Sequence, residues 1–80
     1  MSKIKVGQIY INDYIKYTIT NTIPNIVDGF IEKTYQAIAK DGYCFDVLYE
    51  DYIKKSKMIA EYPTWQEAVN SKEFKNVAED

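Results

Sequence analysis

Turn signals recur along this 80-residue chain and divide it into short runs of β-branched and aromatic residues. The first signal is the pair Asn12 and Asp13, whose side chains tolerate the positive φ angles of a tight hairpin. Residues 6–11 precede this pair and residues 14–23 follow it. The second run alternates apolar and polar side chains on the two faces of a strand: Ile15, Tyr17 and Ile19 against Lys16, Thr18 and Thr20. This alternation predicts an N-terminal β-hairpin.

Two Asp-Gly pairs bracket the next apolar run. Asp28-Gly29 precedes residues 30–39, and Asp41-Gly42 follows them. Asp-Gly between apolar runs is among the strongest local hairpin signals. We therefore expect a strand over residues 30–39, with residues 43–49 pairing back as the next strand of a meander.

The same segment also fits a helix over residues 26–40. Its apolar side chains fall on one helical stripe, which consists of Ile26, Val27, Phe30, Ile31, Tyr35 and Ile38. Asn25 and Asp28 are residue types that can start a helix. Against this alternative, Gly29 early in the helix would cost about 1 kcal/mol, so the meander is preferred.

The stretch 50–57 is polar and predicts a short helical turn. Glu50 and Asp51 each have a lysine four residues later, a spacing at which opposite charges attract on a helix surface. Residues 57–62 follow as the expected last strand.

A capping box marks the start of a C-terminal helix. Thr64 can cap the first free amides of this helix, and Glu67 can return the hydrogen bond. Trp65, Ala68 and Val69 then share one face, which we expect to dock on the sheet with Trp65 as the core anchor.

Phe74 does not fit a continuous helix of this kind. At roughly 100° per residue it lies about 180° from Trp65. Either the helix stops near residues 70–71 or Phe74 is exposed. The last residues, 76–80, are expected to fray.

These elements predict one α+β domain over residues 1–80. Its centre is a small, twisted antiparallel sheet, a meander that can close into an SH3-like barrel. The helix that starts at Thr64 packs on the sheet through Trp65 and Val69. The alternative fold is a β-hairpin followed by a helix over residues 26–40, a second hairpin and the C-terminal helix.

The composition argues against an enzyme. The chain has no histidine and no arginine, so it lacks the usual proton shuttle and the usual bidentate partner of phosphate. We expect no catalytic residues, no metal site and no cofactor.

A net charge of −2 is the wrong sign for a general DNA-binding protein. The single cysteine, Cys44, fits a reducing compartment and is expected to be a half-buried apolar side chain. Without a signal peptide or membrane span in the sequence, we expect a cytoplasmic protein.

Two segments carry a resemblance. The tail AEYPTWQEAVNSKEF, residues 60–74, resembles the end of small uncharacterised proteins encoded by phages and prophages of Gram-positive bacteria. The run VGQIY, residues 6–10, is similar to their first strand. The resemblance implies an accessory phage gene product in the host cytosol, with a small β-barrel or sheet closed by a C-terminal helix. It assigns no activity and no functional residues.

An accessory phage protein without catalytic groups is expected to act by occupying a host protein. The leading hypothesis is an inhibitor or modulator of a bacterial protein, with a component of antiphage defence such as a CRISPR effector as one target class. Eight tyrosines are too many for so small a core, and tyrosine is enriched at interfaces. The predicted partner-binding residues are tyrosines close in sequence to carboxylates: Tyr43, Asp46, Tyr49, Glu50, Asp51, Tyr52 and Tyr62.

A second hypothesis is a small barrel that binds nucleic acid. Such a surface needs lysines interleaved with exposed aromatic rings, and the only basic cluster beside an aromatic ring comprises Tyr52, Lys54, Lys55 and Lys57. A third hypothesis is sequestration of a small signalling nucleotide, with lysines and backbone amides holding its phosphates between subunits.

Overall fold

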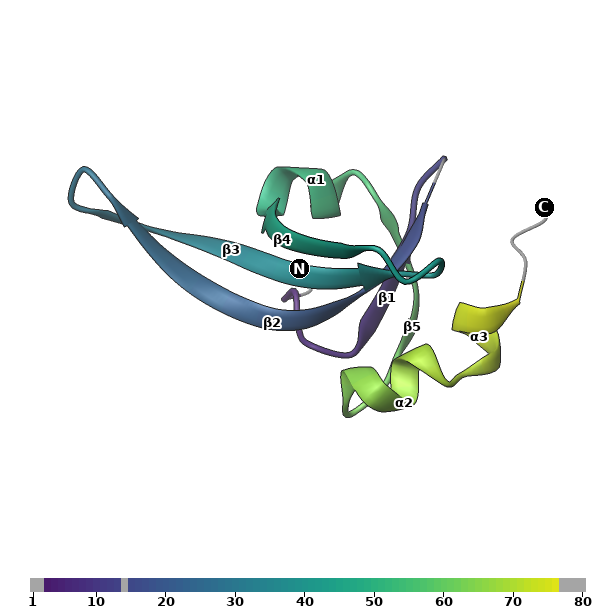
Figure 1. The fold of residues 1–80 in the computed structure, drawn as a ribbon. Helices are drawn as coiled ribbons and strands as arrows, with labels where there is room; N and C mark the ends of the chain where they lie inside the picture. Colours follow the sequence, from purple (N-terminus) through teal and green to yellow (C-terminus); the bar gives the residue numbers. More distant parts are fainter. Residues whose placement is uncertain (1–2, 14, 77–80) are drawn as a thin grey trace.

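Five antiparallel strands form one sheet in the computed structural model, which describes residues 3–13 and 15–76 (Figure 1). The strand order is β4-β3-β2-β1-β5. The strands are β1 (Gln8–Ile11), β2 (Lys16–Val27), β3 (Phe30–Ala39), β4 (Cys44–Tyr49) and β5 (Lys57–Glu61). Within the described residues the helices are α1 (Glu50–Lys54), α2 (Trp65–Val69) and α3 (Lys72–Lys75).

The predicted N-terminal hairpin is confirmed. β1 pairs with β2 in antiparallel register, with Tyr10 opposite Tyr17. At the turn, the Asn12 Oδ1 accepts a hydrogen bond from the Ile15 N–H at 3.0 Å. The second strand begins at Lys16, and Tyr14, at which we expected it to start, lies outside the described residues.

The meander over residues 24–49 is also confirmed, and the alternative helix over residues 26–40 is wrong. Asp28 and Gly29 have φ angles of 51° and 80°, the left-handed pair that a two-residue hairpin turn requires. No residue in a right-handed helix has such a φ angle. Gly42, with φ of 95°, makes the second turn, and its N–H donates to the Ala39 carbonyl at 2.9 Å.

The second and third strands are longer than their neighbours. The pairing of β1 with β2 ends at Thr18, and the pairing of β4 with β3 ends at Thr34. Residues 23–33 therefore form a two-stranded ribbon, the arm, that projects beyond the rest of the sheet on the left of Figure 1.

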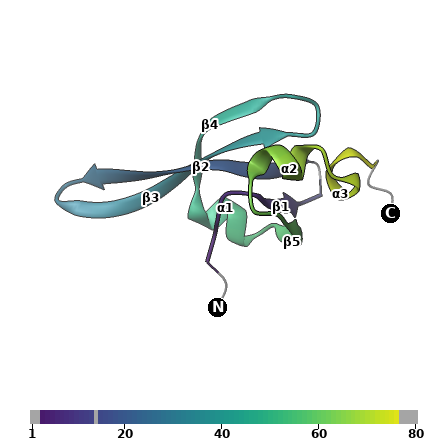
Figure 2. The same cartoon turned by 90° about the horizontal axis from the view of Figure 1, so that it is seen from below.

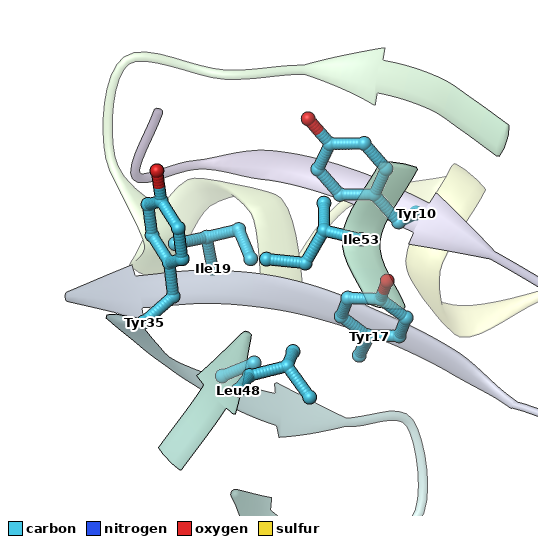
Figure 3. Packing of buried hydrophobic residues seen from close by; sticks show 7 residues of the cluster. Tyr10, Tyr17, Ile19, Tyr35, Leu48 and Ile53 are labelled. Carbon is cyan, nitrogen blue, oxygen red and sulfur yellow. The ribbon is translucent and has the colours of Figure 1, made fainter. Parts of the chain in front are cut away.

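One hydrophobic cluster lies between the sheet and α1, and Figure 3 shows how its side chains converge. Tyr17 is fully buried at its centre and stacks on Tyr10 at 5.8 Å between ring centroids. Ile53 of α1 covers this face and is also buried. The buried members of the cluster are Tyr10, Tyr17, Ile19, Tyr35, Ala37, Leu48 and Ile53.

A second cluster lies on the other face of β1, where Ile9 packs with Ala68 of α2 and Phe74 of α3. Figure 2 is turned so that α2 and α3 lie in front of the sheet. Thr64 caps α2 as predicted, since its Oγ1 accepts a hydrogen bond from the Glu67 N–H at 3.1 Å. Trp65, expected to be the anchor, is only half-buried.

The C-terminal helix is broken into two short helices. Of the two outcomes that the sequence left open for Phe74, the structure shows the first, in which the helix stops near residues 70–71. α2 ends at Val69, and the Ser71 Oγ then caps α3 by accepting from the Phe74 N–H at 3.2 Å. The break returns Phe74 to the sheet, where it is only 4% exposed. Lys16, on the same face, holds α3 by donating from Nζ to the Glu73 and Asn76 carbonyls at 2.5 and 2.8 Å. Of the tail expected to fray, residues 77–80 lie outside the described residues.

Candidate functional site

Most of the predicted partner-binding residues, which are tyrosines and nearby carboxylates, lie along the outer strand β4 and in the first turn of α1. β4 pairs with β3 on one side only, so it is one of the two edges of the sheet. We call this surface the β4 edge; it comprises Tyr43, Asp46, Val47, Tyr49, Glu50 and Asp51. All six side chains are exposed, and over half of the surface of Tyr43, Val47 and Tyr49 is accessible. Sequence analysis missed Val47, because strict alternation puts Val47 on the same side as Phe45, which packs on the core; the register of β4 with β3 shifts between Phe45 and Leu48.

Two side chains of β4, three residues apart, anchor this edge, and the register between β3 and β4 shifts between them. Leu48 is buried in the first cluster, and Phe45 packs against the same cluster with its ring 6.2 Å from that of Tyr17. Phe45 also makes an edge-to-face contact with Tyr43 at 5.0 Å. The Asp41 Oδ1 accepts the Tyr43 N–H at 3.0 Å. These contacts favour one orientation of Tyr43 although its side chain is exposed.

Two of the three carboxylates of the β4 edge lie where negative charge is well tolerated. Glu50 and Asp51 occupy the first turn of α1, where the unpaired amides of a helix start favour acidic groups. Glu50 lies 3.7 Å from the Lys54 Nζ, as the spacing predicted, and this exposed pair is worth little in stability. Burial, with a contribution from the nearby Glu50, raises the pKa of Tyr35 beneath this edge.

Tyr52 and Tyr62 do not join the β4 edge. The Tyr52 ring lies 5.9 Å from that of Tyr17, and its hydroxyl accepts from the Asn12 Nδ2 at 2.5 Å. Tyr62 follows β5, the opposite edge of the sheet. Its hydroxyl donates to the Glu73 carboxylate, a contact that raises the pKa of Tyr62 and lowers that of Glu73.

Three of the four residues of the nucleic-acid hypothesis line one surface hollow. Tyr52, Lys55 and Lys57 border this hollow of about 560 Å³ together with Ile11, Asn12 and Asp13. Lys54 is not part of its lining and points to Glu50 instead. The Asp13 carboxylate weakens the positive potential that the two lysines produce.

The part of the chain that the structure describes holds no group of three or more metal-ligating side chains close enough to bind an ion. Cys44, expected to be half-buried, is exposed on β4 because its side chain projects away from the first cluster. None of the helices in residues 3–13 and 15–76 is long and apolar enough to cross a membrane. Comparison with protein-family models, curated proteins and solved structures finds no match.

The arm carries the most exposed large apolar side chains of the described chain, which sequence analysis named only as part of the stripe of the alternative helix. They are Ile26, Phe30 and Ile31, at 72%, 76% and 74% exposure. The available signal was a pair of apolar runs that continue up to the Asp28-Gly29 turn without polar residues at the strand ends.

Proposed function

We propose that this protein is a non-enzymatic accessory protein that binds a bacterial protein through the β4 edge and thereby inhibits or modulates it. The observation that carries the proposal is the outer strand itself. Val47 and Tyr49 of β4, and Tyr43 directly before it, expose over half of their surface beside a strand that the fold leaves unpaired on one side. Tyrosines that are held in place and solvated are typical anchors of protein interfaces, and unpaired strand edges are recurrent sites of protein binding.

The charge of the β4 edge indicates the chemistry of the partner. Asp46, Glu50 and Asp51 are all exposed, and within the described part of the chain only Glu50 among them lies within ion-pair distance of a lysine. Complementarity then requires a partner surface rich in lysine or arginine. The resemblance of residues 60–74 and 6–10 to phage and prophage proteins supports a host target, with a component of antiphage defence such as a CRISPR effector as one class.

The architecture that we propose for this binding module is SH3-like. The strand order β4-β3-β2-β1-β5 and the one-turn helix α1 between the fourth and fifth strands support it. The two resemblance segments also meet in space. The Tyr62 N–H donates to the Gly7 carbonyl at 3.0 Å, and a side chain at Gly7 would collide with the Tyr62 carbonyl oxygen.

A pull-down from a Gram-positive lysate, with and without nuclease, tests the binding function. The expected result is a host protein that is retained in a stoichiometric ratio to the bait after nuclease treatment. Its Kd is then measured for the charge-reversal variant Asp46→Lys/Asp51→Lys and for the matched control Glu61→Lys/Glu67→Lys, which changes the same charge away from the β4 edge. We expect the first variant to lose about 2–5 kcal/mol of binding free energy and the control to bind normally. Equal affinities would remove the β4 edge from the interface.

The second candidate function is binding of single-stranded nucleic acid in the hollow beside Tyr52. Convergence of Tyr52, Lys55 and Lys57 on one surface favours it. Fluorescence anisotropy with a labelled oligonucleotide should show affinity falling with salt at a slope of about −1.4 in log K against log salt for two phosphate contacts. Lys55→Ala/Lys57→Ala should abolish binding, and Lys33→Ala should not. Salt-independent binding or none would dismiss this candidate.

For the third hypothesis, a small signalling nucleotide, we place the phosphates in the same hollow, where Lys55 and Lys57 lie together. This third hypothesis predicts an oligomer and a rise in melting temperature when nucleotide is added. A monomer whose melting temperature does not change would contradict it.

A further inference from the structure

The tip of the arm is apolar on both of its faces. Ile26 lies directly opposite Ile31 in the register, so their side chains share one face of the ribbon. Tyr35, four residues beyond Ile31 on the same strand, points to that face as well. Phe30 points to the other face. All three tip side chains are more than 70% exposed, although the hydrophobic effect favours their burial.

The arm is a preorganised, regularly paired ribbon. Ten residues of each strand pair in register from Tyr17 opposite Ala39 to Val27 opposite Phe30, with one irregularity near Asn21. The Asp28-Gly29 turn adopts the left-handed angles that match the twist of the strands. A partner that binds the tip therefore does not have to order a flexible loop, which is a major cost of association.

Two possible occupants of the tip fit poorly. A second copy that added a strand would need a long unpaired edge. The outer edge of β2 is interrupted by Pro24, which has no N–H, and the outer edge of β3 is unpaired only from Phe30 to Lys33. A membrane would receive the Asp28 carboxylate first and then the unpaired backbone groups of the ribbon, both of which are costly in hydrocarbon.

We propose that the arm inserts Ile26, Phe30 and Ile31 into an apolar cleft of the same host protein that the β4 edge binds, and that lysine or arginine side chains border this cleft. The inference rests on the proposed function. Two carboxylates, Asp28 and Glu32, stand on the arm against a single lysine, Lys33, so the arm has the same sign of charge as the β4 edge.

The two surfaces are also continuous. β4 ends at Tyr49, which pairs with Thr34 on β3, and the preceding residue of β3, Lys33, already belongs to the arm. A partner seated on Tyr49 and Glu50 would therefore lie at the base of the arm. The surface of this partner would have to accommodate the arm, because the arm projects past the end of β4 in Figure 1.

Site-specific photocrosslinking tests this inference in the full-length protein. The photoreactive residue p-benzoylphenylalanine replaces Phe30, Tyr49 or, as a control on α3, Lys72 in three separate variants expressed in Gram-positive cells. The expected result is that the probes at positions 30 and 49 crosslink to the same protein and the probe at 72 does not. Peptide mapping should place the position-30 crosslink in an apolar segment next to lysine or arginine.

The outcomes separate the inference from the function on which it rests. A crosslink at position 49 with none at 30 would overturn the arm and leave the β4 edge in place. A crosslink from position 30 to a second copy of the chain, to lipid or to a polar segment would also overturn it. No crosslink from either position would overturn both.

Affinity for the crosslinked protein gives a second readout. Ile26→Thr/Ile31→Thr keeps the β-branched shape that suits a strand and removes the apolar surface. We expect it to weaken binding about 30-fold without a change in melting temperature. The control Ile59→Thr makes the same exchange on β5, the opposite edge of the sheet, and should bind normally. Unchanged affinity of the double variant would contradict the inference.

Discussion

Phe74 should contribute more to stability than any other side chain of the C-terminal helices. It is 4% exposed and packs with Ile9 and Ala68, although it belongs to a helix of only four residues. A buried phenylalanine removes about 150 Å² from water or slightly more, which at about 25 cal/mol per Å² is worth about 4 kcal/mol. Phe74→Ala should lower the free energy of unfolding by about 3–5 kcal/mol, because it also leaves a cavity.

The stability loss of Phe74→Ala is best compared with that of Trp65→Ala. From the sequence, Trp65 was the expected anchor, with a cost of about 3–5 kcal/mol for its removal. Because the side chain is only partly buried and belongs to neither core cluster, the structure predicts a smaller loss than for Phe74, about 2 kcal/mol. The sequence named Trp65 as the anchor and left the burial of Phe74 open, whereas the structure predicts that Phe74→Ala is the more costly variant.

Urea denaturation followed by circular dichroism at 25 °C measures both variants without relying on tryptophan fluorescence. An 80-residue domain has a total stability of about 4–12 kcal/mol, so Phe74→Ala could unfold completely. Phe74→Leu, expected to cost about 1 kcal/mol, keeps the test quantitative. A loss below about 1 kcal/mol in Phe74→Ala would show that α3 does not unfold together with the sheet. A larger loss in Trp65→Ala than in Phe74→Ala would restore the expectation from the sequence.

Two further predictions concern the sheet. Burial raises the pKa of Tyr17 to about 12, whereas the unfolded chain loses this proton near pH 10, so stability is complete below pH 10 and falls by about 2–3 kcal/mol as pH rises to 12. Urea unfolding at pH 9 and 11.5 measures the fall, which Tyr17→Phe should reduce; an unchanged stability of the original protein would contradict it. Gly7→Ala should cost at least about 2 kcal/mol more in thermal unfolding than Gly42→Ala. Both glycines have φ near 95°, but a Cβ at Gly7 would lie 2.2 Å from the Tyr62 carbonyl oxygen, whereas Gly42 has no atom within 4 Å; equal costs would refute the clash.

Local signals in the sequence determined the strands. Asp28-Gly29 and Asp41-Gly42 predict the bounds of β3 because only a few residue types adopt left-handed φ angles at low cost. The same local chemistry explains why the capping threonine and the Glu50–Lys54 pair were predicted correctly. These features depend on neighbours within about four residues of each other.

Tertiary structure alone decided what the strands expose. Tyr62 is separated from the β4 edge because β5 pairs with β1 at the far side of the sheet, a contact between residues about 50 positions apart in sequence. The arm is exposed because β1 and β4 end before β2 and β3 do, which no signal within the arm records. Phe74 is buried because a helix break at Ser71 turns it toward Ile9. Local sequence sets the conformation of each segment, whereas the surface left for a partner depends on where distant segments stop covering one another.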